Sequence, residues 1–210
     1  MRGSKMARAQ SNEERGTMSA RRYTTEITLR DGRKATVRPL EPTDLEPLTA
    51  YFLSLSEETR RRYGPHPFDR ATAEKLCAST DDQRIVRFVA VLDDGGTSPE
   101  IIGYMILSRE IWPDDQKRYG NRLRQGECAC FAPSIADAYQ DQGIGTQMAR
   151  HVLACAKEMG IRQLILMGGV QAANDRARHF YAKLGFREVG SFWLHLHGQD
   201  IFNYDMMLEL

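Results

Sequence analysis

Apolar residues in the second half of the chain recur with two different periods. A continuous apolar run at 128–135 is typical of a buried strand. After a short polar stretch, apolar residues return every three or four positions: Ile144, Met148, Val152, Cys155 and Met159. This spacing predicts one helix with a single buried face. The sequence therefore predicts a strand that turns into a helix through the segment 139–146.

The rest of the chain divides into further strand-like and helix-like segments. Strands are predicted at 26–29, 34–38, 84–92, 100–107, 163–167, 188–196 and 201–208. Helices are predicted at 43–55, 57–62, 71–78 and 174–184. Asp31 and Gly32 indicate a hairpin between the first two strands, and Thr43 with Glu46 fits a capping box. The charged segment 112–126 is poor in aliphatic residues, which predicts a long flexible loop.

Two closely spaced glycines, Gly143 and Gly145, stand where the strand at 128–135 gives way to the helix. The first N–H groups of a helix lack intrahelical partners, and the helix dipole adds partial positive charge there. Such a turn suits a phosphate or pyrophosphate, because glycine lets the ligand approach the backbone. A nucleotide-hydrolase loop is excluded by the absence of Gly-Lys-Ser/Thr, and the dinucleotide fingerprint lacks its third glycine. The alternative is a turn that only packs the helix against the strand.

A second stretch, residues 174–186, has the features of a complete amphipathic helix. Asn174 is a good N-cap residue, and Gly185 stands where a left-handed C-cap is expected. One face of this helix carries apolar and aromatic side chains: Ala177, Phe180, Tyr181 and Leu184. On these grounds alone, both aromatic residues are compatible with a role in the core.

Together, these two stretches resemble the GNAT superfamily of N-acetyltransferases. Gln140-x-x-Gly143-x-Gly145 is similar to the acetyl-CoA pyrophosphate loop of that family, and the second stretch is similar to its N-x-x-A-x-x-F-Y-x-K-L-G-F signature. The resemblance covers roughly residues 24–210 and is most specific over 128–187. It implies an α/β fold with a mixed, mostly antiparallel central sheet of about seven strands. Helices would flank this sheet, which would splay between its fourth and fifth strands.

The resemblance also implies acetyl-CoA as the acyl donor and a set of residues around it. The family holds the thioester carbonyl on a backbone N–H of the central strand, here near 134–136. Pro133 cannot donate a ladder hydrogen bond, which favours a bulge at this point. The implied donor-binding residues are Ile135, Ala136, Gln140, Asp141, Gln142, Gly143, Ile144, Gly145, Thr146, Asn174 and Phe180. Tyr181 is implied to protonate the departing thiolate, which suits a phenol with a pKa near 10.

The residue that would accept the proton of the amine is not evident. Segments 29–39, 53–58 and 136–140 resemble the GNAT domains of bacterial protein-lysine acetyltransferases, which tend to carry a catalytic glutamate on the central strand. The corresponding position here holds Cys130. Glu127 lies about 10 Å earlier on the opposite face of a strand, so it is either a weak catalytic candidate or a solvated charge. A water relay could take the proton instead, or the acceptor could arrive already neutral.

Composition limits the class of protein. The 210 residues suffice for one well-buried domain at 23–210, and the polar segment 1–22 resembles an expression leader or a disordered tail. A net charge of +1 gives no sign of a nucleic-acid partner. No apolar run has transmembrane length, so we expect a cytoplasmic protein with no membrane partner. Four cysteines fit small buried hydrophobes, and no spacing indicates a metal site: Cys77, Cys128, Cys130 and Cys155.

These observations predict an N-acetyltransferase that moves an acetyl group from acetyl-CoA to a primary amine. Direct attack in a ternary complex is expected, because no cysteine stands next to a motif histidine as a covalent relay would require. One alternative is a protein-lysine acetyltransferase, and another is a non-catalytic acyl-CoA-binding module. The sequence leaves open the acceptor, the length of the acyl chain and the choice between a monomer and a homodimer.

Overall fold

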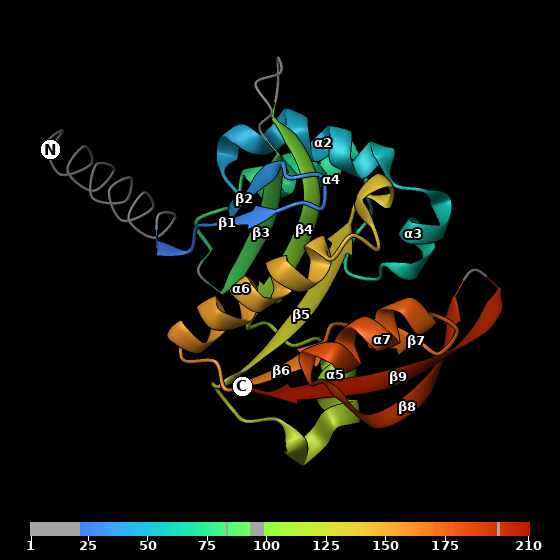
Figure 1. The fold of residues 1–210 in the computed structure, drawn as a ribbon. Helices are drawn as coiled ribbons and strands as arrows, with labels where there is room; N and C mark the ends of the chain where they lie inside the picture. The colour runs from blue at the N-terminus through green and yellow to red at the C-terminus, as the bar shows by residue number, and fades with distance from the viewer. Residues whose placement is uncertain (1–21, 83, 93–98, 197) are drawn as a thin grey trace, which may run out of the picture.

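The computed structural model describes residues 22–82, 84–92, 99–196 and 198–210. The predicted leader at 1–22 therefore lies outside the described residues except for its last position. The described chain forms one nine-stranded sheet with helices on both faces (Figure 1). The strands run in the order β1-β2-β3-β4-β5-β6-β9-β7, and β8 pairs with β9. Every pairing is antiparallel except β5 with β6, which confirms the predicted mixed, mostly antiparallel sheet.

The strands are β1 (Thr25–Thr28), β2 (Lys34–Pro39), β3 (Ile85–Leu92), β4 (Glu100–Ser108), β5 (Cys128–Ile135), β6 (Gln163–Leu166), β7 (Val170–Gln171), β8 (Arg187–Leu196) and β9 (Gln199–Glu209). The helices are α2 (Leu45–Ser54), α3 (Glu57–Arg62), α4 (Arg70–Cys77), α5 (Pro113–Tyr119), α6 (Ile144–Glu158) and α7 (Asp175–Leu184). Short 3₁₀ turns lie at Pro42–Asp44, Gly120–Arg122 and Asp137–Tyr139. Among these strands and helices, the two-residue strand β7 and the helix α5 were not predicted.

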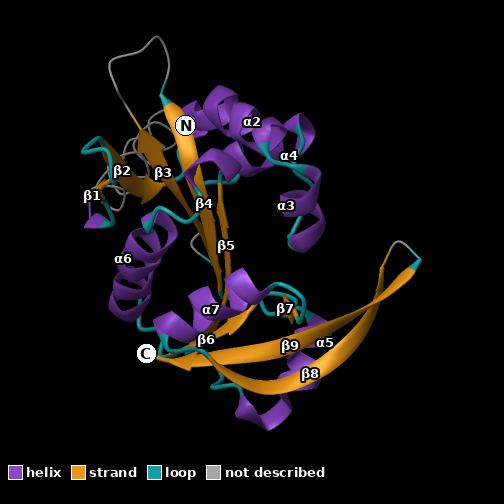
Figure 2. Ribbon diagram, turned by 45° about the vertical axis from the view of Figure 1, so that its right-hand side comes forward, coloured by secondary structure: helices purple, strands orange, loops and turns teal. Residues whose placement is uncertain are grey.

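The sheet has a separate apolar core on each face. Neighbouring residues of β4 show this division, because successive side chains of a strand point to opposite faces. Tyr104 packs beneath α2 with Phe52, whereas Met105 packs beneath α6 with Met148. In Figure 2, α2, α3 and α4 accordingly lie on one side of the strands and α6 on the other. All four of these side chains are fully buried.

The two halves of the sheet diverge between β5 and β6. These strands pair in parallel only from Cys128 to Phe131, and β5 then continues to Ile135 alongside β4 alone. The chain after β6 turns away through Gly168 and Gly169 into β7, which pairs with β9. Figure 2 shows the result, with β3, β4 and β5 upright and β6, β8 and β9 running across below them. The predicted splay is present, and in this nine-stranded sheet it lies between the fifth and sixth strands instead of the fourth and fifth.

Two local predictions about the strands and helices were wrong. The helix α2 does not begin with a capping box of Thr43 and Glu46, because Asp44 occupies its N-cap position. The Asp44 carboxylate instead accepts hydrogen bonds from the Glu41 N–H (2.8 Å) and the Arg38 guanidinium (2.7 Å). The bulge expected at Pro133 is also absent from β5, whose pairing with β4 continues without a register shift.

The segment 112–126 was predicted to be a flexible loop. That prediction was wrong, because the segment contains α5. The charged residues of this helix bind the rest of the fold. Arg118 pairs with Asp115 in the same helix and with Asp205 of β9, where Nε lies 3.1 Å from Oδ1. The Asp115 carboxylate also accepts the Gly168 N–H at 3.1 Å. Because Gly168 begins the turn into β7, α5 fixes the position of that turn.

We expect Asp115→Ala to lower the free energy of unfolding by roughly 3 kcal/mol, because it removes one partner of a buried charge pair. Asp115 is 1% exposed, and its loss also leaves the Gly168 N–H without an acceptor. Urea unfolding measures this change. Arg124→Ala is the matched control, since its pair with Glu209 is half exposed and should contribute less than about 1 kcal/mol. Equal effects of the two variants would contradict this account of α5.

Candidate functional site

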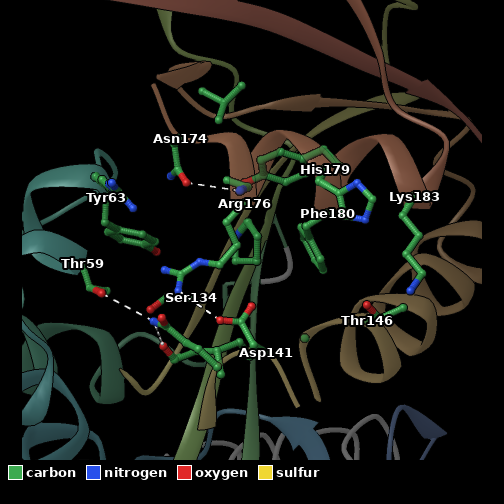
Figure 3. A pocket seen from close by; sticks show the side chains of 18 of the residues that line it. Thr59, Tyr63, Ser134, Asp141, Thr146, Asn174, Arg176, His179, Phe180 and Lys183 are labelled. Carbon is green, nitrogen blue, oxygen red and sulfur yellow. Dashed lines mark hydrogen bonds and ion pairs between the residues drawn. The ribbon is translucent and has the colours of Figure 1, made fainter. Parts of the chain in front are cut away.

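A cavity of about 380 Å³ opens where β5 and β6 diverge. Predicted residues that line it are Ile135, Gln140, Asp141, Gly143, Gly145, Thr146, Asn174, Phe180 and Tyr181. Ser134, in the segment expected to hold the thioester carbonyl, also lines it. So do residues that had not been assigned to the site: Arg30, Thr59, Arg62, Tyr63, Pro133, Tyr139, Gly169, Val170, Arg176, Ala177, His179 and Lys183. In Figure 3, Thr146 and Lys183 lie at one end of this pocket and Tyr63 and Thr59 at the other.

The glycine turn places free N–H groups at the N-terminus of α6. Gly143 has φ +83°, a left-handed conformation that favours glycine, and it is the N-cap residue of the helix. The Gln147 N–H donates to the Gly143 carbonyl at 3.1 Å, so the N–H groups of the three residues between them precede the first helical hydrogen bond. A Cβ on Gly143 would meet no atom within 4 Å. The backbone here is therefore open to a ligand.

Two glutamine side chains hold the turn in place. Gln140 Nε2 donates to the Ile135 carbonyl at 3.0 Å, and Gln142 Nε2 donates to the Ala138 carbonyl at 2.9 Å. Asp141 between them has φ +58°, a rare conformation for a residue with a side chain. Gln142 is not among the described residues that line the cavity, and its side chain stabilises the turn.

One backbone N–H at the end of β5 faces the opening. Ala136 is not part of the cavity wall, because it is buried and its N–H donates to the Ile102 carbonyl at 3.0 Å. In an antiparallel ladder, alternate residues bond to the same neighbouring strand. The Ile135 N–H therefore points away from β4, toward the gap left by β6. Ile144 is likewise buried in the core, so only its backbone can reach a ligand.

Helix α7 brings Tyr181 to the cavity. Asn174 caps this helix by accepting the Ala177 N–H at 3.2 Å, as predicted. Tyr181 is 8% exposed and packs against Phe180 and Phe186 at ring-centroid distances of 5.3 and 5.5 Å. Burial raises the pKa of the Tyr181 phenol. Its hydroxyl makes no hydrogen bond to the described part of the chain, so it is available to a molecule in the cavity.

The side chains around the glycine turn are mainly cationic. Arg30, Arg62, Arg176 and Lys183 line the cavity, and Asp141 is the one carboxylate among the described residues that do so. Asp141 is paired with Arg176 at 3.6 Å. This excess of positive charge favours an anionic ligand. Arg176 and Lys183 stand seven positions apart on α7, a spacing that could have identified them, whereas nothing in the sequence links Arg30 to this site.

Neither the weak base candidate Glu127 nor Cys130, at the strand position of the family's glutamate, lines the cavity. Glu127 is exposed and precedes β5, about 26 Å of strand away from Ile135. It is therefore a solvated charge at the far end of the strand, and we do not retain it as a catalytic candidate. Cys130 is fully buried against Tyr119 and Ile165, and burial raises the pKa of its thiol. Cys130 occupies the strand position at which the resembling domains carry their glutamate, but it does not line the cavity.

Comparisons with known proteins agree with this geometry. The model of the acetyltransferase (GNAT) domain family matches residues 34–187. An acetyltransferase of Pseudomonas aeruginosa is 29% identical over 161 residues, which cover 76% of this chain and 78% of that protein.

Solved structures share the fold at lower identity. The GNAT domain of S. lividans PAT has a TM-score of 0.68 at 23% identity and covers 90% of this chain and 98% of its own. Mycobacterium smegmatis RimJ in complex with CoA-disulfide has a TM-score of 0.67 at 16% identity, and the match covers 89% of this chain and 86% of that chain. No described helix combines the length and the apolar character needed to cross a membrane.

Proposed function

Because the chain belongs to the GNAT family of acetyltransferases, we propose that its cavity binds acetyl-CoA and that a primary amine attacks the thioester directly in a ternary complex. The observation that carries this proposal is the group of free N–H donors at the N-terminus of α6, beside Arg176 and Lys183. Backbone donors at a helix N-terminus, with cations around them, suit a pyrophosphate.

Two groups are positioned to assist the transfer. The Ile135 N–H faces the opening and would polarise the thioester carbonyl, where negative charge develops as the amine attacks. The amine nitrogen forms a bond to the carbonyl carbon, and the bond from that carbon to sulfur breaks. Tyr181 would give its proton to the departing thiolate, and the proton lost by the nitrogen would pass through water to the tyrosinate and restore the neutral phenol. Both groups lie on rigid elements, β5 and α7.

The acceptor must reach the thioester as a neutral amine. Among the described residues that line the cavity, the one carboxylate is Asp141, which is already paired with Arg176. Burial of an ammonium group without a partner is unfavourable, so the cavity itself lowers the pKa of a bound amine. In this proposal, desolvation deprotonates the bound amine. No glutamate is needed for this step, and its strand position is occupied by Cys130.

The same observation favours a polypeptide amine as the acceptor class. A small ammonium compound would need a carboxylate for recognition, whereas a polypeptide can be bound by surfaces outside the cavity. The β8–β9 hairpin extends on the same side of the molecule as α3 in Figures 1 and 2. It carries the exposed side chains of Trp193 (68%) and Leu194 (43%). A protein-lysine acetyltransferase remains one form of this second proposal.

Release of free thiol from acetyl-CoA tests the proposed function with three acceptors. These are spermidine, a lysine peptide with a blocked N-terminus, and a lysine-free peptide with a free N-terminus. We expect thiol release with at least one of them, together with a mass gain of one acetyl group on the acceptor. Faster reaction of a peptide than of spermidine would support the acceptor class. Binding of acetyl-CoA without release for any amine would instead indicate an acyl-CoA-binding module.

A further inference from the structure

Tyr63 follows α3, and its hydroxyl makes no hydrogen bond that would stabilise the described part of the fold. Its side chain lines the cavity. Its hydroxyl is buried from solvent and has no hydrogen-bond partner among the described residues. A buried hydroxyl without a partner is energetically unfavourable, so native proteins rarely retain one without a reason. A ligand that enters the cavity could supply the missing partner.

The backbone that carries Tyr63 is fixed from several directions. The Asp137 carboxylate accepts the Ser56 N–H (2.8 Å) and the Thr59 hydroxyl (2.7 Å), which ties the start of α3 to the turn after β5. Arg60 donates to the Leu55 carbonyl at 2.8 Å. It also donates to the carbonyl groups of Phe52, Leu53 and Phe68. Arg60 is therefore a structural residue.

The opposite wall of the site is tied to α3 as well. Gln171 of β7 donates from Nε2 to the Arg61 carbonyl at 3.2 Å, across the gap between the two halves of the sheet. The ring of Tyr63 packs against Phe68 and His66, with centroid distances of 4.5 and 5.3 Å. The hydroxyl is consequently held in one position before any ligand binds.

Other tyrosine hydroxyls lie near that of Tyr63, and most are already paired. Burial first, and then the nearby Tyr104, Tyr51 and Tyr181, raise the pKa of Tyr63 well above its usual value. Tyr51 is bonded to Ser134 at 2.6 Å, and the Tyr104 hydroxyl is bonded to His66 Nε2 at 3.2 Å. Within the described chain, Tyr63 and Tyr181 are thus the members of this group whose hydroxyls remain available to a ligand.

We propose that the Tyr63 hydroxyl accepts a hydrogen bond from the attacking amine and so orients its lone pair toward the thioester. This inference rests on the proposed function, in which the Ile135 N–H serves the carbonyl oxygen and Tyr181 serves the sulfur. The amine nitrogen is the remaining reacting atom that needs a partner. A neutral phenol accepts an N–H but lacks the charge with which a carboxylate stabilises an ammonium, so it raises the pKa of the bound amine less than a carboxylate would.

Tyr63→Phe removes the hydroxyl and keeps the ring contacts with Phe68 and His66. It is measured with each amine of the three-member panel that the wild type acetylates. We expect the KM for the amine to rise about three- to tenfold, which corresponds to one neutral hydrogen bond. The Kd of acetyl-CoA, measured by calorimetry without amine, should stay within twofold. The melting temperature should not fall, because the removed hydroxyl has no partner in the fold.

Tyr104→Phe is the matched control. It removes a buried tyrosine hydroxyl that does not line the cavity but is bonded to His66. We expect a lower melting temperature and an unchanged KM for the amine, the reverse of the Tyr63→Phe pattern. An unchanged kcat/KM for the amine in Tyr63→Phe would overturn the assignment of Tyr63 to the amine, since loss of an orienting bond lowers kcat and loss of a binding bond raises KM. Failure of the wild type to acetylate any amine would instead overturn the proposed function.

Discussion

Replacing Tyr181 by phenylalanine is expected to lower kcat by about 10²- to 10⁴-fold, the usual contribution of a general acid. The phenylalanine ring keeps the contacts with Phe180 and Phe186, so the cavity should retain its shape. The Kd of acetyl-CoA should therefore change less than twofold. Steady-state kinetics and calorimetry on the same preparation separate these two quantities. A kcat within threefold of the wild type would show that the thiolate departs without a proton from Tyr181.

The dependence on pH provides a second check on Tyr181. Burial raises its pKa, and the acid must be protonated to act, so a higher pKa extends its active range upward. The kcat should therefore show no alkaline decline due to this group up to about pH 10, the ordinary pKa of a tyrosine. Tyr119→Phe is a suitable control, because the Tyr119 hydroxyl is buried elsewhere and donates to the Met206 carbonyl at 2.9 Å. That variant should lose stability but little turnover.

Gly143→Leu is expected to weaken acetyl-CoA binding at least tenfold. The loss of a single charge-assisted hydrogen bond to the pyrophosphate would suffice for an effect of this size. Gly143 has φ +83°, and a Cβ there would point into open space at the N-terminus of α6. A leucine side chain would both strain this conformation and occupy the space in front of the N–H groups. Calorimetric titration measures the affinity.

The other end of the same helix supplies the control for backbone strain. Gly160 follows α6, has φ +78° and also has no atom within 4 Å of a Cβ. Gly160→Leu should therefore lower the melting temperature about as much as Gly143→Leu, while leaving the affinity for acetyl-CoA unchanged. If both variants lost the same affinity for acetyl-CoA, the loss would result from lower stability and not from a blocked glycine turn.

The regular parts of this fold could be predicted because their patterns are local. The apolar spacing of α6 and the apolar run of β5 required no knowledge of the rest of the chain. The glycine turn and Tyr181 could be located for the same reason, since each belongs to a contiguous motif. Asn174 likewise caps α7 where its sequence position indicated.

The parts that could not be predicted depend on contacts between distant segments. α5 looks like a polar loop because its charged residues find partners on β9 and in the turn before β7, which no local pattern reveals. Tyr63 and Arg30 reach the cavity from elements far from the glycine turn in sequence. Glu127 was considered only because it is the carboxylate nearest in sequence to the strand position of the family's glutamate, although it lies at the far end of β5 from Ile135.

The thermal midpoint of the purified protein with and without acetyl-CoA tests most directly whether this cavity binds the donor. A ligand at about 100 times its Kd adds about 2.7 kcal/mol to the free energy of unfolding. For a chain of this size, that corresponds to a rise of roughly 5–10 °C. We expect such a rise for the wild type and at most about half of it for Gly143→Leu at the same concentration, as binding at least tenfold weaker implies. No rise for the wild type at saturating acetyl-CoA would contradict the account.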